Sequence, residues 1–342
     1  MKAIQLIKYG SADKAFRSAE VSKPKLQSED DVLVKVHAFG LNFADVMARK
    51  GLYRAAPPIP AVLGYEVVGE VVEVKSKNHQ SLIGKRVVAL TRFGGYAEYA
   101  CTKISGLVEI PNQINDGEAL ALATQYCTAF LAVKKCQELK EKDAVLIHSA
   151  TGGVGTAITQ LLKHKGCKVI GLTRSNEKVD YLIKNGVDIP IVTTKGDYSK
   201  QIQEAIKNKK VAASFNSVGG KTIKKDLSLL ATSGQLVFFG ISDRTNQKRG
   251  ILFTLFQLLK IGKTHPAKLL LNSQAIHGLN LLALADNKSE QIKEALQELI
   301  SLRLESKIFP KADFSFDWEN IAEAHDGLEK AKFTGKVFIK VV

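Results

Sequence analysis

A strand-like run enters a glycine-rich turn near the middle of the chain, and a helical pattern leaves it. The run covers Ala144–His148, the turn follows at Ser149–Gly155, and the apolar helical pattern continues through Thr156–Leu162. Glycine lets the backbone approach a pyrophosphate without a Cβ clash, and a helix N-terminus supplies free N–H donors and a positive dipole end. This order of strand, turn and helix is the context that a dinucleotide-binding turn requires. The expected contacts are Ala150, Thr151, Gly152, Gly153, Val154 and Gly155.

The sequence on both sides of this turn predicts a parallel sheet. From about Leu120 onward, apolar strand-like runs alternate with helical patterns. Repeated strand–helix units place helices on both faces of a parallel sheet, so we expect an α/β fold with a doubly wound sheet here. The predicted strands are Ala144–His148, Lys168–Leu172, Ile189–Val192, Val211–Phe215 and Gln235–Gly240, with Leu270–Ile276 as a further candidate.

The first third of the chain predicts a different architecture. Short runs rich in Val and Tyr are separated by Gly and Pro, which is typical of a small antiparallel barrel or sandwich. The expected strands are Met1–Ile7, Asp31–Gly40, Tyr65–Val74, Lys85–Leu90 and Gly94–Cys101, with a short helix or turn at Phe43–Arg49. After about Leu281, an amphipathic helix at Ser289–Leu302 precedes a final strand at Lys336–Val341. A chain of 342 residues has room for two such domains.

The net charge and the spacing of the cysteines indicate which classes of protein this chain can belong to. The formal net charge of +15 would attract anions such as phosphorylated cofactors, acidic membranes or nucleic acid. Basic residues are spread along the chain without a recognisable nucleic-acid module, which favours a solvated lysine surface. The four cysteines are scattered without metal-ligand spacing, which favours reduced thiols and a cytoplasmic location. We expect neither a signal peptide nor a membrane span.

One unusually apolar segment, Ile251–Lys260, follows the last predicted cofactor loop. We interpret it as buried core. Two alternatives stay open: a roof over a hydrophobic substrate cleft, and a contact with a membrane surface edged by Lys260 and Lys263.

The end of the second predicted strand indicates which dinucleotide binds. Enzymes that use NAD usually place an acidic residue there to bind the ribose 2′-OH. Here the strand ends in Thr173-Arg174-Ser175, and Lys178 follows one helical turn on. Such residues can hold a 2′-phosphate by charge-assisted hydrogen bonds, which predicts NADPH. The alternative is that Ser175 caps the next helix and the two cations are solvated.

Several motifs together resemble the medium-chain dehydrogenase/reductase superfamily, in its zinc-independent quinone oxidoreductase (zeta-crystallin-like) branch. They are Gly40–Asp45, Arg49–Tyr53, Gly64–Gly69 and the Ala-x-Gly-Gly-Val-Gly turn. Three further segments resemble the subgroup of proteins like the vesicle amine transport protein, namely Pro57–Pro60, Asn185–Val187 and Asp197-Tyr198. The resemblance implies a GroES-like catalytic domain of residues 1–123 and 281–342, and a Rossmann domain of residues 124–280.

The resemblance also indicates whether this chain has the residues that bind zinc. Zinc-dependent relatives have a Cys where this chain has Asn42, a His where it has Tyr65, and a third ligand near Thr124. A catalytic zinc needs three converging N, S or O side chains, so we expect no metal. Without a Lewis acid, suitable substrates already carry an electron sink, as quinones and α,β-unsaturated carbonyls do. We therefore expect reduction of such substrates with NADPH as the hydride donor.

The remaining site residues are implied by the resemblance. It puts Asn42, Asp45 and Tyr53 beside the nicotinamide as candidate catalytic residues, with Tyr53 as a hydrogen-bond or proton donor. The alternatives are that Asn42 and Asp45 cap the short helix and that Tyr53 is packing. Relatives often place a Tyr beside the 2′-phosphate where this chain has Thr193. The further implied cofactor contacts are Thr128, Ser217, Phe239, Gly240, Ile241 and Lys336.

Two functions follow from these expectations. The first is an NADPH-dependent quinone or enone reductase that forms a homodimer. The second is an NADPH-binding protein with little catalysis that acts through a membrane, protein or RNA partner, an alternative that the positive charge keeps open.

Overall fold

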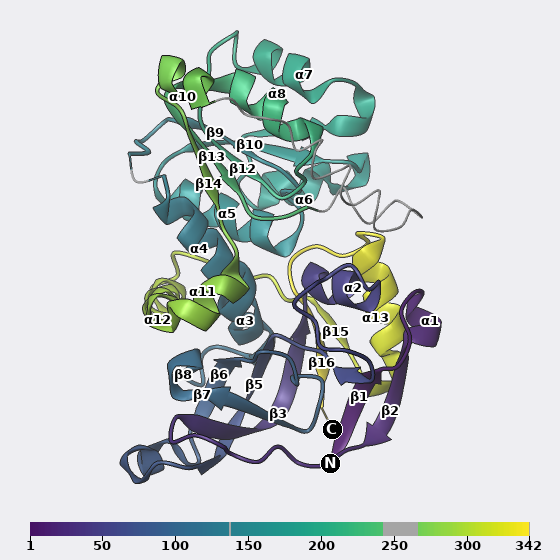
Figure 1. The fold of residues 1–342 in the computed structure, drawn as a ribbon. Coiled ribbons are helices and arrows are strands. Elements are labelled where there is room, and N and C mark those ends of the chain that lie inside the picture. The colour runs from purple at the N-terminus through teal and green to yellow at the C-terminus, as the bar shows by residue number, and fades with distance from the viewer. Residues whose placement is uncertain (137, 242–265, 342) are drawn as a thin grey trace. The chain divides into compact units, whose positions relative to one another are not determined.

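The computed structural model describes residues 1–136, 138–241 and 266–341, and it forms two compact units (Figure 1). The first unit consists of Met1–Cys127 and Leu281–Val342, and the second of Thr128–Asn280. The segment Ile251–Lys260 and Lys263 lie outside the described residues. Among the described residues, no helix is both long and apolar enough to span a membrane.

The second unit is built on a six-stranded parallel sheet with the order β11-β10-β9-β12-β13-β14. The central strands are near-continuous apolar runs because helices cover both faces of the sheet. The sheet order reverses direction at β9, which makes the edges of β9 a switch point of the Rossmann type. The strands are β9 (Ala144–Ile147), β10 (Lys168–Thr173), β11 (Ile189–Val192), β12 (Val211–Asn216), β13 (Leu230–Phe238) and β14 (Ala275–Gly278).

The helices of this unit alternate with its strands, as the sequence predicts. They are α4 (Cys127–Lys134), α5 (Gly153–His164), α6 (Val179–Lys184), α7 (Tyr198–Ala205), α8 (Lys221–Leu229) and α10 (Pro266–Asn272), with short 3₁₀ turns at Asn176–Lys178 and Thr193–Lys195. The apolar faces of α7 and α8 pack on the sheet around Ile202, Ile223 and Leu227. A parallel sheet needs helices on both faces, and this packing buries the face on which α7 and α8 lie.

One predicted strand of this unit is wrong. Residues 270–276 were expected to be extended, but Leu270 and Leu271 lie on α10 and are 79% and 83% exposed. A proline at the first helical position favours the helix, and Ser273 ends it with a φ of +49°. Only the last part of the apolar run, from Ala275, joins the sheet as β14.

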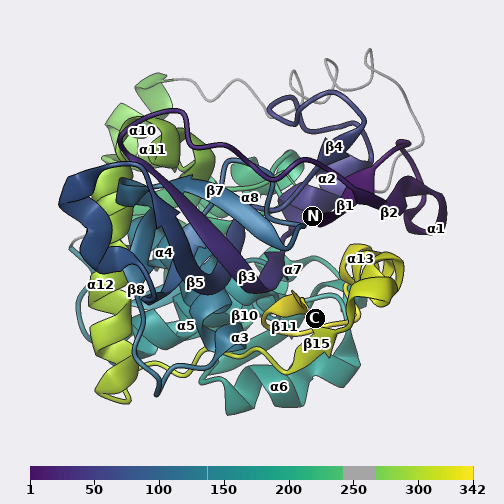
Figure 2. The ribbon, with the colours of Figure 1, turned by 90° about the horizontal axis from the view of Figure 1, so that it is seen from below.

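The first unit contains a seven-stranded sheet centred on β3 (Asp31–Leu41). The path runs β15-β16-β3-β5-β6-β8, and β7 also pairs with β3 (Figure 1). Figure 2 shows β3, β5, β7 and β8 from below. The strands other than β3 are β5 (Glu66–Val74), β6 (Arg86–Leu90), β7 (Tyr99–Lys103), β8 (Leu107–Glu109), β15 (Phe314–Phe316) and β16 (Val337–Lys340). All pairings are antiparallel except that between β15 and β16. The β-rich first unit and the parallel Rossmann-type sheet of the second unit confirm the predicted fold class.

A smaller sheet and several helices complete the first unit. The sheet has the order β2-β1-β4, formed by β1 (Lys2–Leu6), β2 (Phe16–Glu20) and β4 (Ala61–Val62). The helices are α1 (Ala12–Ala15), α2 (Phe43–Arg49), α3 (Asp116–Leu120), α11 (Leu281–Asn287), α12 (Ser289–Leu304) and α13 (Ile321–Glu329). The 3₁₀ segments lie at Lys77–Leu82, Ile104–Gly106 and Trp318–Asn320, and Ala121–Tyr126 is a π-helix.

The predicted strand at Gly94–Cys101 begins later than expected. Gly94 has a φ of +83°, so the chain turns there instead of extending. Ala97 makes an isolated bridge to Ala3, and regular pairing starts only at Tyr99. The β-rich composition correctly predicts a strand here, but the turn at Gly94 delays the start of β7 to Tyr99.

Candidate functional site

The glycine-rich turn lies at the carboxyl end of β9 and leads into α5, which begins at Gly153. A Cβ on Gly155 would lie 2.4 Å from the backbone oxygen of Ser149 and 2.6 Å from Cα of Ala150. Only glycine therefore allows the first turn of the helix to approach the strand end this closely. Gly152 is the N-cap residue, and the N-terminus of α5 presents backbone N–H groups of the kind that bind phosphate.

The turns after β12 and β13 meet the turn after β9. The Ser217 hydroxyl donates to Ser149 Oγ at 3.1 Å, and a Cβ on Gly240 would lie 2.8 Å from Ser217 O. Phe239 N donates to Asn216 O at 3.1 Å, which holds the start of the segment that continues to Ile241. The structure thus brings Ser217, Gly240 and the glycine-rich turn together at one edge of the sheet.

The end of β10 places two cations next to this edge. Thr173 is buried, Arg174 is exposed and Lys178 is half-buried. The pKa of the Lys178 ammonium is lowered, first by burial and second by the charge of Arg174, so the two cations lie within reach of each other. The Ser175 side chain makes no capping hydrogen bond. Ser175 nevertheless stands at the N-cap position of the turn Asn176–Lys178, so the structure shows the capping position without the side-chain hydrogen bond.

These features fit a dinucleotide. The close approach at Gly155 and the N-terminus of α5 suit a pyrophosphate, and the β10 end offers cations where a 2′-phosphate would lie. Two threonines brace that end: Thr193 Oγ1 donates to Thr173 O at 3.2 Å, and Thr194 Oγ1 donates to Arg174 O at 3.2 Å. Thr128, the other implied contact of this unit, is half-buried on α4.

In the first unit, a buried polar cluster forms around Glu66, at the start of β5. The Asn42 amide donates to Glu66 Oε1 at 3.0 Å and to Oε2 at 2.7 Å. The Lys336 ammonium pairs with Glu66 and also donates to Asn42 Oδ1 at 3.1 Å and Leu41 O at 3.3 Å. A Cβ on Gly40 would lie 2.0 Å from Glu66 Oε1, so a glycine at this position on β3 leaves the space for the cluster.

This arrangement gives Lys336 a structural role. Its side chain is fully buried and forms an ion pair with Glu66 in the core of the first unit, and the expected contact with a cofactor stays a prediction. A buried carboxylate requires such a counter-charge, because desolvation of an unpaired charge is costly. Sequence reasoning missed Glu66, which is the buried first residue of β5, a strand that also carries Glu70 and Glu73.

Asp45 caps the helix that follows Asn42. Its Oδ2 accepts from Asn42 N at 2.8 Å, and the two residues form a capping box at the start of α2. The side chain is fully buried in this structure, and its expected catalytic role stays a prediction. Burial, and next the charge of Glu66, raise the pKa of Asp45 to about 8. The alternative that Asn42 and Asp45 cap the short helix is the one that the structure shows.

Tyr53 keeps its candidate role. It is half-buried, packs against the core of the first unit, and lies edge-on to Tyr65 with ring centroids 6.1 Å apart. Burial raises the pKa of both hydroxyls, so both stay protonated and can donate. Tyr65 OH is buried without a hydrogen-bond partner among the described residues, and its ring contacts Phe93 at 5.1 Å. A donor of this kind can serve a bound carbonyl oxygen.

No group of three His, Cys, Asp or Glu side chains within the described parts of the chain is arranged to hold a metal. At two of the three positions that bind zinc in relatives, this chain has the Asn42 amide, which is bonded to Glu66, and the Tyr65 phenol.

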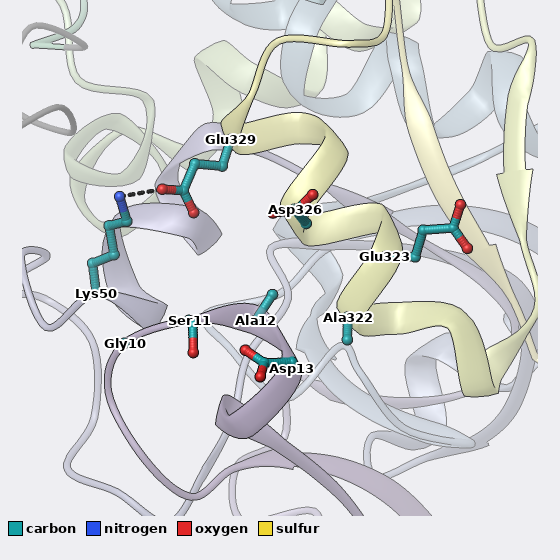
Figure 3. Close-up of a pocket in the computed structure, with 9 residues that line it drawn as sticks. All are labelled: Gly10, Ser11, Ala12, Asp13, Lys50, Ala322, Glu323, Asp326 and Glu329. Carbon is teal, nitrogen blue, oxygen red and sulfur yellow. Dashed lines mark ion pairs between the residues drawn. The ribbon is translucent and has the colours of Figure 1, made fainter.

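A cavity of about 540 Å³ opens elsewhere in the first unit (Figure 3). Its lining comes from the segment around α1, the end of α2 and one side of α13, and it contains none of the predicted site residues. Acidic side chains dominate it, and Glu329 among them is paired with Lys50 and Arg49. The lining residues are Gly10, Ser11, Ala12, Asp13, Lys50, Ala322, Glu323, Asp326 and Glu329.

Comparison with known proteins finds relatives along the whole chain. Residues 28–112 match the alcohol dehydrogenase GroES-like domain, and residues 153–300 match the zinc-binding dehydrogenase family. The synaptic vesicle membrane protein VAT-1 homolog of Rattus norvegicus is 30% identical over 340 residues, which cover 99% of this chain and 84% of that protein.

Two solved structures are similar throughout. The human synaptic vesicle membrane protein VAT-1 homolog-like protein superposes with a TM-score of 0.84 at 27% identity, covering 100% of this chain and 98% of that one. Escherichia coli quinone oxidoreductase, solved in complex with NADPH, superposes with a TM-score of 0.85 at 25% identity and covers 100% of both chains.

Proposed function

Because this chain belongs to the medium-chain dehydrogenase/reductase family, in the branch that holds the quinone oxidoreductases and VAT-1 homologues, we propose that it is an NADPH-dependent oxidoreductase. Its substrates are quinones or α,β-unsaturated carbonyls, and it needs no metal. The observation that carries the cofactor assignment is the pair of cations at the end of β10. Burial first, and then the charge of Arg174, lower the pKa of Lys178, and an anion bound between the two cations would stabilise both charges.

The chain's own residues define what the site can do. NADPH supplies the hydride when it is bound. The first turn of α5 holds the pyrophosphate, and Arg174, Ser175 and Lys178 hold the 2′-phosphate. Hydride addition to a conjugated acceptor gives a delocalised anion, so a hydrogen-bond donor can take the place of a Lewis acid. The protonated Tyr53 hydroxyl is the proposed donor to the substrate oxygen.

The chemistry at Asn42 supports a reaction without zinc. Its amide is bonded to Glu66 and Lys336, and an amide is not among the side chains that zinc prefers. In this proposal Asn42 forms the floor of the site, and its bonds to Glu66 and Lys336 hold its amide in place.

The cofactor assignment is tested by removing the two cations. We expect Arg174→Ala combined with Lys178→Ala to weaken NADPH binding by at least about tenfold while NADH binding is unchanged. Lys168→Ala combined with Lys184→Ala is the matched control, because it removes two exposed lysines from the same unit. The measurement is fluorescence titration with each dinucleotide. An equal loss for NADPH and NADH would refute the 2′-phosphate assignment.

The reaction is tested by following NADPH oxidation with an ortho-quinone and several enones. Tyr53→Phe should lower kcat and leave NADPH affinity unchanged, because the hydroxyl acts on the acceptor. NADPH binding with no turnover on any acceptor would favour the second candidate function, a cofactor-binding protein that acts through a partner.

The distribution of charge favours that second candidate. The second unit carries 24 Lys and Arg against 10 Asp and Glu, a formal charge of +14, and the first unit carries 25 against 24. Such an asymmetry indicates an anionic partner for the Rossmann unit. Salt-dependent binding to anionic vesicles or RNA by a protein that turns over no acceptor would support it.

Homodimerisation is a further part of the proposal. β14 is the last strand in the order of the described sheet, and α10 before it exposes Leu270 and Leu271. An exposed apolar pair beside a sheet edge suits a second copy of the chain. Sedimentation that gives the mass of a monomer at micromolar concentration would contradict this.

A further inference from the structure

Asp226, on α8, is a buried carboxylate of the second unit. Its side chain has no exposed surface. Oδ2 accepts from Ser214 Oγ at 2.8 Å and from Asn216 Nδ2 at 2.6 Å, and Oδ1 accepts from Tyr198 OH at 2.8 Å. His148 Nε2 lies 2.9 Å from Oδ2 and 3.1 Å from Oδ1. Four side chains therefore converge on one carboxylate.

Asn216 connects this carboxylate to the turn after β12. Its amide nitrogen donates to Asp226 and to Thr222 Oγ1, at 2.6 Å and 2.9 Å. This fixes the orientation of the amide, because both of its hydrogens are in use. Its oxygen then accepts from the backbone N–H groups of Val218 at 2.9 Å and Gly219 at 2.8 Å. The conformation of the turn therefore depends on which way the Asn216 amide points.

His148 connects the same carboxylate to the glycine-rich turn. It follows β9 directly, its backbone N–H donates to Phe215 O at 2.9 Å, and the next residue, Ser149, has a φ of +50°. A left-handed conformation at a serine is strained and persists only where its neighbours hold it. Ser149 also accepts the hydrogen bond from Ser217 that joins the two turns.

We propose that Asp226 is a positioning residue for the cofactor site, because its carboxylate fixes the glycine-rich turn through His148 and the turn after β12 through Asn216. This inference rests on the proposed function, since it assigns Asp226 to the binding of the dinucleotide. Asp226 itself, being buried, contacts no cofactor. Burial and the neighbouring carboxylate raise the pKa of the Tyr198 hydroxyl, which stays protonated and donates throughout.

The first experiment compares two variants of α8. Asp226→Asn places an amide donor among side chains that already donate, and we expect the Kd for NADPH to rise about tenfold. Leu227→Ala is the matched control, because Leu227 is the next residue, is buried in the same core and makes no bond to either turn. It should lower the melting temperature and leave the Kd within about twofold.

A rescue variant separates positioning from stability. Combining Asp226→Asn with Asn216→Asp exchanges the two groups, so that a donor again faces an acceptor while the new carboxylate accepts from Val218 and Gly219. We expect the double variant to regain most of the NADPH affinity that Asp226→Asn loses. A Kd for Asp226→Asn within about twofold of the parent, or an equal loss in Leu227→Ala, would overturn the proposal.

Hydrogen exchange decides the inference independently of cofactor binding. In the protein without cofactor, Asp226→Asn should speed amide exchange at residues 149–155 and 217–220, and Leu227→Ala should not do so selectively. Equal exchange in the two variants at these segments would overturn the positioning role. A parent protein that binds no NADPH would contradict the proposed function, and the exchange result would still decide the role of Asp226 in the two turns.

Discussion

Asp226 in the second unit and Asp45 in the first are both fully buried carboxyl groups, but their surroundings differ. Asp226 receives hydrogen bonds from four side chains, and both of its oxygens are used. Asp45 accepts from the backbone of Asn42 through Oδ2, while Oδ1 has no hydrogen-bond partner among the described residues. Donors stabilise a buried carboxylate, and burial without donors favours the protonated acid.

The difference shows that burial alone does not define the role of an acid. The fully bonded Asp226 holds two turns in place, so its effect is geometric. The incompletely bonded Asp45 lies near the charge of Glu66, and its pKa is raised to about 8, so its charge responds to pH near neutrality. Counting the hydrogen-bond donors at each oxygen therefore helps to distinguish a carboxylate that titrates from one that holds structure.

The ion pair beside Asp45 gives the largest expected effect. Lys336→Met removes the counter-charge of Glu66 and leaves a buried carboxylate with the Asn42 amide alone, so we expect a loss of about 3–5 kcal/mol in the free energy of unfolding. Urea denaturation measures it. Lys340→Met, at the exposed last position of β16, the strand that Lys336 directly precedes, is the control. Similar losses in both variants would show that the ion pair is not what stabilises this end of β16.

A smaller effect is expected from Asp45→Asn, and it depends on pH. The folded-state pKa of Asp45 lies above that of an unfolded aspartate, so the stability that this group contributes is complete below about pH 4 and is lost as the pH rises towards about 8. An amide keeps the cap on Asn42 N and does not ionise. As the pH rises from 5 to 8, the melting temperature of the variant should therefore rise relative to that of the parent by on the order of 5 °C.

The control for this pH series is Asp30→Asn, which removes an exposed carboxylate from the same unit. The difference in melting temperature between Asp30→Asn and the parent should stay constant over the same pH range. If the difference in melting temperature between Asp45→Asn and the parent also stays constant with pH, the raised pKa of Asp45 is contradicted. Asp45 would then not differ from Asp226 in its response to pH.

The smallest effect is expected at a single donor of Asp226. Tyr198→Phe removes one hydrogen bond to a carboxylate that keeps three other side-chain partners, so the free energy of unfolding should fall by about 1–2 kcal/mol. Thermal or urea denaturation measures this change. Tyr9→Phe, at a residue that is 46% exposed, should stay within about 0.5 kcal/mol. A loss as large as that for Lys336→Met would mean that Asp226 is not redundantly bonded.

Local patterns in the sequence predict the elements that local interactions determine. The helix Phe43–Arg49 has the predicted bounds because Asn42 and Asp45 stand at capping-box spacing. The strand Ile189–Val192 is likewise found as predicted, as a short apolar run between turn residues. At Leu270 and Leu271 apolar character was a poor guide, because both side chains are exposed on a helix.

Contacts between distant residues could not be predicted in this way. Nothing near Lys336 in the sequence indicates Glu66, from which it is separated by 270 positions. Asp226 did carry a signal: it stands between Ile223 and Leu227 on the apolar stripe of α8, where an acid requires buried partners. The partners themselves, His148 and Asn216, follow only from the order of the strands in the sheet.

The long separation between Glu66 and Lys336 has a consequence for biosynthesis. During translation, the sheet of the first unit lacks β16 and Glu66 lacks its counter-charge until residues 336–340 have left the ribosome. The second unit is continuous from Thr128 to Asn280, so its described strands are all available earlier. The nascent chain can therefore complete the second unit before Glu66 meets Lys336.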